Sequence, residues 1–131
     1  VLEERQVAEQ AANDETLVQS NAAALFEDAG SFVGGNPNGD YTIVEFLDYR
    51  CGYCKRAHPE VAELIDTDGN IRLIVKEFPI LGEASVFAAR VALAAQMQGK
   101  YESFHRGRGP LGGLEQVSVS KPARELVRAR V

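Results

Sequence analysis

Cysteine is scarce in this chain of 131 residues: there are two, and both lie in the short segment Cys51-Gly-Tyr-Cys54. A four-cysteine zinc site is therefore excluded, because the chain has no second pair to complete it. A purely structural disulfide is a weak alternative, since a disulfide that closes so small a loop stabilises a fold little. The composition leaves redox chemistry as the leading interpretation of the pair.

Long apolar runs are also missing. One of the longest is Val91-Ala-Leu-Ala-Ala95, far short of the roughly 20 residues that a membrane-spanning helix needs. No charged and then apolar leader with a cleavage site opens the chain. Because Val1 falls inside an expected helix, we interpret the chain as a trimmed or mature product, with its export signal absent. An apolar content of 45% supports one domain with a real core.

A signature of nucleic-acid binding is absent as well. The chain is acidic, with a net charge of −5. Its C-terminal part is rich in arginine, but these arginines are not interleaved with aromatic residues as they are in many RNA- and DNA-binding surfaces. We interpret them as the solvated face of a helix and expect no nucleic-acid partner.

The two cysteines follow an alternating apolar run, Tyr41–Asp48, and precede a segment with helical spacing from about 52 to 66. Cys51 is therefore expected at the helix N-terminus, where free N–H groups and the positive end of the helix dipole stabilise a thiolate. Cys54 lies one turn further in. Helical spacing groups it with an apolar stripe that faces the core: Ala57, Val61, Leu64 and Ile65.

This placement predicts a division of labour between the sulfurs. Cys51, at the tip, can attack a partner's disulfide, while Cys54 is shielded until it resolves the mixed disulfide. Gly52 and Tyr53 lie between them. We expect these two residues to contact the substrate and to tune the redox potential through local N–H directions and sulfur solvation.

Residues 41–104 resemble a bacterial DsbA-like thiol:disulfide oxidoreductase of the thioredoxin superfamily. The motifs that carry the resemblance are Asp48-Tyr-Arg-Cys-Gly-Tyr-Cys-Lys55, Pro59, Lys76-Glu-Phe-Pro-Ile-Leu81 and Gly99-Lys-Tyr-Glu-Ser-Phe-His105. The resemblance implies an α/β thioredoxin-like fold with a helical insertion and an N-terminal helical extension. It also implies protein substrates with thiols or disulfides, a redox partner protein, no cofactor, and export to the periplasm.

The resemblance further implies that Glu45 is the partly buried carboxylate behind Cys54, where it accepts a proton. Alternation along the strand independently places Ile43, Glu45 and Leu47 on one face. A strand covered on both faces would bury Glu45 and raise its pKa toward the range useful for a base. The alternative interpretation is an exposed glutamate on an edge strand.

The remaining pattern predicts a helical extension over 1–30 and a thioredoxin-like domain over 31–131. The extension is helical over 2–28, with a break expected at Asn13-Asp14. In the domain we expect a short edge strand at Phe32-Val33, a second firm strand over 71–78 that is parallel to the first, and a helix over 83–99.

The C-terminal half of the domain departs from the family. Its last segment, 118–130, has the pattern of a helix, and the cis-proline β-hairpin of the family is missing. We therefore expect a truncated or atypical end, an incomplete sheet with an exposed edge, and self-association through that edge or through the N-terminal helix.

Two alternatives to redox chemistry stay open. Cys51, Cys54 and His58 supply three donors that suit copper or zinc. A further alternative is an interaction module, in which the N-terminal helix oligomerises and the cysteines are incidental. His105 is interpreted as a residue at the end of a helix.

Overall fold

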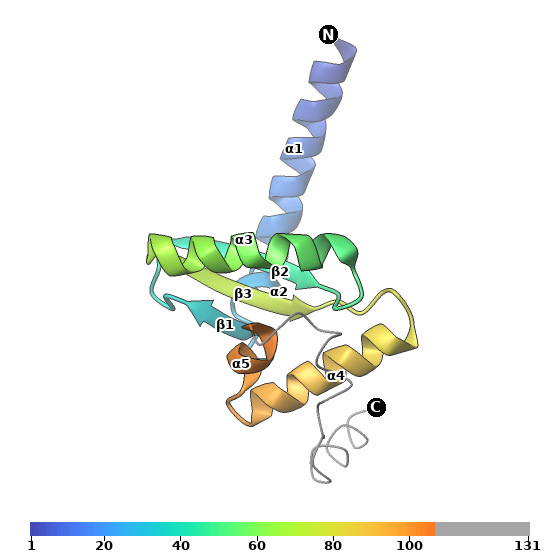
Figure 1. The fold of residues 1–131 in the computed structure, drawn as a ribbon. Coiled ribbons are helices and arrows are strands. Elements are labelled where there is room, and N and C mark those ends of the chain that lie inside the picture. The colour runs from blue at the N-terminus through green and yellow to red at the C-terminus, as the bar shows by residue number, and fades with distance from the viewer. Residues whose placement is uncertain (107–131) are drawn as a thin grey trace. The chain divides into compact units, whose positions relative to one another are not determined.

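The computed structural model describes residues 1–106, and they include all the helices and strands discussed below (Figure 1). Contacts divide the chain into two compact units, Val1–Gly30 and Ser31–Val131. The predicted helix over 118–130, and the truncated or atypical C-terminal half, lie outside the described residues. Within residues 1–106, no helix is both long and apolar enough to cross a bilayer.

The first unit consists of α1 (Leu2–Ser20) and α2 (Ala22–Phe26). The predicted break at Asn13-Asp14 is wrong, since α1 runs through it and the break falls at Asn21. Asn and Asp each cost a helix only a fraction of a kcal/mol, which 19 consecutive helical residues tolerate. At Asn21, by contrast, the side-chain amide donates to the Leu17 carbonyl over 2.8 Å and so competes with the helical hydrogen bonds.

The second unit is built on a three-stranded sheet of β1 (Phe32–Gly35), β2 (Tyr41–Leu47) and β3 (Ile71–Glu77). Its order is β1-β3-β2, with β1 antiparallel and β2 parallel to the central strand. The predicted parallel pairing is confirmed. Because α3 connects β2 to β3, the crossover follows the usual βαβ pattern.

Three helices accompany the sheet: α3 (Gly52–Asp68), α4 (Glu83–Met97) and α5 (Tyr101–Arg106). Figure 1 shows α3 alongside the sheet. Pro59 lies inside α3, which ends at Gly69 in the left-handed conformation. The helix predicted over 83–99 ends two residues early, and Gly99, with φ of 67°, leads into the separate α5.

The core lies between one face of the sheet and residues of α3, α4 and α5. Its buried members are Leu47, Tyr49, Ile65, Ile71, Leu73, Val75, Ala88, Ala92 and Tyr101. Cys54 and Val61 of α3 pack against this cluster. The N-terminus of α3 is thereby fixed next to the carboxyl end of β2, which is where the cysteines lie.

The inward face of α3 differs from the predicted stripe. Ala57 and Leu64 are exposed, whereas Cys54, His58, Val61 and Ile65 are partly or fully buried. The prediction included Ala57 and Leu64 in the stripe because both residues are apolar. The helix instead rotates so that His58 faces inward, one turn after Cys54.

Candidate active site

The turn between β2 and α3 places Cys51 at the helix N-terminus. Cys51 is the N-cap residue, with an extended backbone (φ −74°, ψ 119°). Its N–H donates to the Asp48 carbonyl over 3.0 Å, and its own carbonyl accepts from the Lys55 N–H over 3.1 Å, the first helical hydrogen bond. The sulfur of Cys51 is thus presented at the helix tip, as the sequence predicts.

The surroundings of Cys51 favour its thiolate. The backbone N–H of Cys54 and then the Cys54 thiol hydrogen bond to the Cys51 sulfur, and together they lower the pKa of Cys51. These donors belong to the first turn of α3, where N–H groups have no intrahelical partner. A thiol that ionises more readily is the better candidate for the attacking group.

Cys54 has the opposite electrostatics. It packs against the core, and burial raises its pKa, to which the negative charge of Glu45 adds. The pKa directions of the two cysteines agree with the difference that the sequence predicts. Both thiols are free in the structure.

Glu45, on β2, is partly buried. Its Oε2 atom is buried and accepts no hydrogen bond from the described residues. Burial raises the pKa of the Glu45 carboxyl, which is the direction that the sequence predicts. The alternative of an exposed glutamate is therefore wrong. β2 is an edge strand of the described sheet, but the rest of the domain covers the inner face of β2.

Gly52 and Tyr53 lie on the surface beside Cys51. The Tyr53 side chain is 78% exposed, and the Arg56 guanidinium lies 4.5 Å from the centroid of its ring. A Cβ atom added at Gly52 would meet no atom within 4 Å. Both positions are accessible to an approaching chain, and their contact with substrate stays a prediction.

Asp48 is a site residue that the sequence analysis missed. Its buried carboxylate accepts from the N–H groups of Arg50 (2.8 Å), Ile80 (2.9 Å) and Leu81 (3.0 Å). The turn that carries Cys51 is thereby joined to the loop between β3 and α4. The position of Asp48, directly after a strand and before a helix cap, is a signal for a side-chain turn. The sequence pattern was instead interpreted as a strand that extends to Asp48.

Glu77 is a second carboxyl near the site that the sequence did not predict. Glu77 Oε1, at the end of β3, accepts from the hydroxyls of Tyr101 (2.6 Å) and Tyr49 (3.2 Å). The tyrosine hydroxyls lie 3.4 Å apart. Burial raises the pKa of Glu77 to about 7, against the hydrogen bonds from both tyrosines. Alternation along β3 places Glu77 on the same side as Val75, and this was the available signal.

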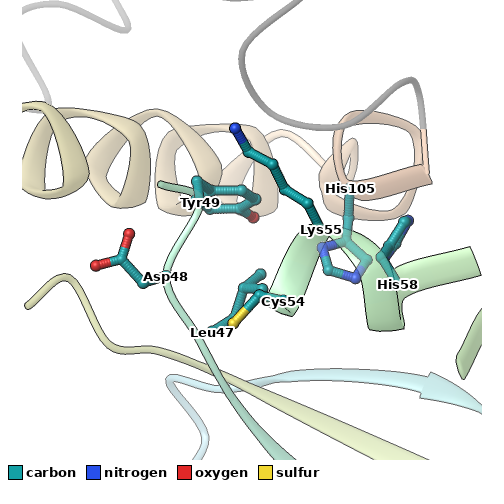
Figure 2. Close-up of a pocket in the computed structure, with 7 residues that line it drawn as sticks. All are labelled: Leu47, Asp48, Tyr49, Cys54, Lys55, His58 and His105. Carbon is teal, nitrogen blue, oxygen red and sulfur yellow. The ribbon is translucent and has the colours of Figure 1, made fainter. Parts of the chain in front are cut away.

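A pocket opens beside Cys54 (Figure 2). Its lining residues come from the β2–α3 segment, α3 and α5: Leu47, Asp48, Tyr49, Cys54, Lys55, His58 and His105. The rings of His58 and His105 are perpendicular, with centroids 4.5 Å apart. His105 is in the last turn of α5, as expected for a helix end, but it is buried rather than exposed, and burial lowers its pKa to about 4.

The pocket does not favour the metal-binding alternative. Within residues 1–106, no group of three His, Cys, Asp or Glu side chains is arranged to hold a metal ion. The geometry therefore does not support a site made of Cys51, Cys54 and His58.

The decisive comparison concerns residues 27–107, which match a model of thioredoxin. The chain belongs to the thioredoxin family. Among solved structures of this fold, a thioredoxin-like oxidoreductase from Silicibacter pomeroyi DSS-3 is 46% identical with a TM-score of 0.70, over 82% of this chain and 68% of that one. The thiol-disulfide exchange protein α-DsbA2 from Wolbachia pipientis is 31% identical with a TM-score of 0.63, over 86% and 59%.

Curated relatives that match part of this chain are much longer than the chain. The Na(+)/H(+) antiporter NhaA 1 of Salinispora arenicola is 35% identical over 75 residues, which is 56% of this chain and 12% of that protein. The chain thus spans about an eighth of the length of this relative.

Proposed function

We propose that this domain is a thiol:disulfide oxidoreductase that exchanges disulfides with protein substrates. The observation that carries the proposal is the placement of two thiols in contrasting surroundings at the N-terminus of α3. Cys51 lies at the tip with a lowered pKa, and Cys54 packs against the core with a raised one. Membership of the thioredoxin family supports the same chemistry.

The exchange proceeds in two displacements. The Cys51 thiolate attacks one sulfur of a substrate disulfide, forms a mixed disulfide and releases the other substrate sulfur as a thiolate. The Cys54 thiolate then attacks the Cys51 sulfur, forms the Cys51–Cys54 disulfide and releases the second substrate thiolate. The substrate is reduced and the pair oxidised, and the reverse sequence oxidises a substrate.

In this mechanism Glu45 takes the proton that Cys54 loses. The raised pKa of its partly buried carboxyl makes it a stronger base than a solvated glutamate, and its charge acts on Cys54. The free Oε2 atom has no competing hydrogen-bond donor among the described residues. Gly52 and Tyr53 form the exposed surface that meets the substrate backbone.

A redox partner protein restores the pair after each turnover, because each exchange leaves it in the other oxidation state. Disulfide exchange with protein substrates suits an oxidising compartment. We therefore place the domain in the periplasm. Fractionation of cells that express the natural gene, with antibody detection of this domain, tests the location, and recovery in the cytosolic fraction alone would contradict it.

Stopped-flow exchange with an aromatic disulfide, whose two released thiolates absorb light, tests the roles. The first release reports attack by Cys51 and the second reports resolution by Cys54. Glu45→Gln is expected to slow the second step by roughly 10²-fold, the lower range for a general base, and to leave the first nearly unchanged.

Glu63→Gln, an exposed glutamate of α3, serves as the matched control and should match the parent in both steps. Equal slowing of both steps by Glu45→Gln, or of neither, would contradict the role of Glu45. A single release in place of two would contradict the role of Cys54.

A further inference from the structure

Two carboxyls lie on the same face of the sheet near the cysteines. In the parallel register, Glu45 is opposite Val75 and Leu47 is opposite Glu77. Glu45 and Glu77 are therefore diagonal neighbours on adjacent strands, a separation of about 7–8 Å between backbones that long side chains can bridge. Each has an Oε2 atom that is buried without a hydrogen-bond partner among the described residues.

The other oxygen of Glu77 is firmly held. Tyr101 donates to Oε1 over 2.6 Å and Tyr49 over 3.2 Å. Both rings belong to the core and both residues are only 2% exposed. Tyr101 in turn stacks on Phe32 of β1, with ring centroids 4.3 Å apart. Hydroxyls from the β2–α3 turn and from α5 therefore hold this carboxyl, and β1 packs on the ring of Tyr101.

This cluster is connected to the reacting thiols. Tyr49 lies two residues before Cys51 and lines the pocket together with Cys54. The charge of Glu45 raises the pKa values of both Glu77 and Cys54. Two carboxylates so close together repel each other, so the protonation of one changes the proton affinity of the other.

We propose that Glu77, held by the hydroxyls of Tyr49 and Tyr101, is a positioning residue for the exchange reaction: its charge state sets how strongly Glu45 attracts the proton of Cys54. The inference rests on the proposed function. When Glu77 is neutral, Glu45 carries the single negative charge of the pair and is a weaker base. When Glu77 is ionised, protonation of Glu45 relieves the repulsion, and the transfer from Cys54 becomes more favourable.

Several titratable groups lie near Glu77. Glu45, Asp48, Tyr49 and Tyr101 act directly on Glu77, and the neighbouring pocket, which Tyr49 also lines, adds Cys54, Lys55 and His58 of α3 and His105 of α5. The buried residues of α4 are serine, alanine and valine, which do not titrate. β1 contributes no titratable side chain, since its sequence is Phe-Val-Gly-Gly. Asp48 is already ionised at neutral pH because its pKa is lowered, and the pKa of His105 of about 4 keeps it neutral. Burial lowers the pKa of His58 below its ordinary value, so Glu77, with a pKa of about 7, is the group of this set whose charge changes at neutral pH.

The test is the pH dependence of the second thiolate release with the same aromatic disulfide. In the parent protein the rate of resolution should rise around pH 7 as Glu77 ionises, by up to about tenfold for each unit added to the pKa of Glu45. Glu77→Gln keeps an oxygen for the tyrosines but does not titrate, so this rise should be lost. Glu63→Gln should retain it.

Tyr101→Phe supplies an independent variant that keeps the stacked ring. Because the hydrogen bond from Tyr101 lowers the pKa of Glu77, its loss should move the rise to higher pH. A purely structural role for Glu77 would change the rate at all pH values without moving the rise. A rise that persists unmoved in Glu77→Gln would overturn the inference, and if that variant fails to fold, an unmoved rise in Tyr101→Phe would do the same.

Failure of the proposed function can be recognised separately. If the parent protein shows no thiolate release, the infrared band of protonated carboxyl groups is followed against pH instead. The inference then expects a band that titrates near pH 7 in the parent protein and is absent from Glu77→Gln. The lack of such a band would overturn the inference whatever the exchange activity.

Discussion

Cys51 and Cys54 are chemically identical groups in different surroundings. Hydrogen bonds from the first helical turn lower the pKa of Cys51, whereas burial raises that of Cys54. At neutral pH the outer sulfur is therefore the more ionised. This difference in ionisation, rather than the pair of cysteines itself, defines which sulfur attacks first.

Thiolate absorbance titrations of the single-cysteine variants measure this difference. Cys54→Ser should give a midpoint for Cys51 below the free-thiol value of about 8.5, and Cys51→Ser should give one for Cys54 above it. Cys54→Ser removes the hydrogen bond from the Cys54 thiol to the Cys51 sulfur, but the backbone N–H of residue 54, which also donates to that sulfur, stays in place. A Cys51 midpoint at or above about 8.5 would exclude it as the attacking thiol.

Local patterns predict some of these residues, and distant contacts determine the others. Cys51, Cys54 and Glu45 were found because a strand, a turn and a helix N-terminus are local signals. Asp48 and Glu77 were missed as site residues because most of their partners are far away in sequence. Ile80 is 32 residues from Asp48, and Tyr101 is 24 residues from Glu77. Only the folded chain brings such groups together.

At the scale of elements, Asp48 joins two connecting segments that are far apart in the sequence, the β2–α3 turn and the β3–α4 loop. One carboxylate accepts N–H groups from the β2–α3 turn and from the β3–α4 loop. Both connections leave the carboxyl ends of neighbouring parallel strands. The position of the Cys51 turn therefore depends on the segment that leads into α4.

Asp48→Asn is expected to lower the free energy of unfolding by about 2 kcal/mol, because an amide nitrogen replaces one acceptor and faces buried N–H donors. Chemical denaturation measures this, with the exposed Glu60→Gln as the control. The folded-state pKa of Asp48 is lowered, so its stabilisation is complete above the unfolded value of about 4 and is lost as pH falls through the folded value. A difference between variant and parent that does not shrink in acid would contradict this account.

Periodicity was a good guide to the strands and a poorer guide to helix ends and faces. Alternation identified both long strands within one residue of their observed ends. For α3, the apolar stripe misplaced Ala57 and Leu64, because a helix with a histidine and few large apolar residues has a weakly defined face. The separation of α4 from α5 depends on Gly99, which adopts φ of 67°, and a glycine alone does not tell whether a second helix follows.

At the scale of the whole molecule, the N-terminal unit has apolar side chains that its own two helices do not cover. No residue of α1 is buried, and Leu2, Val7 and Leu17 are at least 60% exposed. A helix of 19 residues with so little burial is marginal by itself. We expect it to associate with further copies of the chain.

Light scattering on the 131-residue chain should report an oligomer, and Val7→Glu with Leu17→Glu should reduce it to a monomer by placing charge in the apolar contact. Gln10→Glu adds a charge to the same helix without removing an apolar group, and it should remain oligomeric. A monomeric parent protein would rule out self-association through either the helix or the sheet edge.

The order of the strands has a consequence for how the chain acquires its structure. Among the strands of residues 1–106, β3 pairs with both others, and it is the last of these three to be synthesised. Phe32 of β1 pairs with Val75, and Tyr41 of β2 pairs with Ile71, so the described sheet contains no local hairpin, and its contact order is high. Until residue 77 has emerged, both cysteines belong to an unpaired, solvent-accessible chain. The burial that raises the pKa of Cys54 therefore requires β3, whereas the hydrogen bonds that lower the pKa of Cys51 are local to α3.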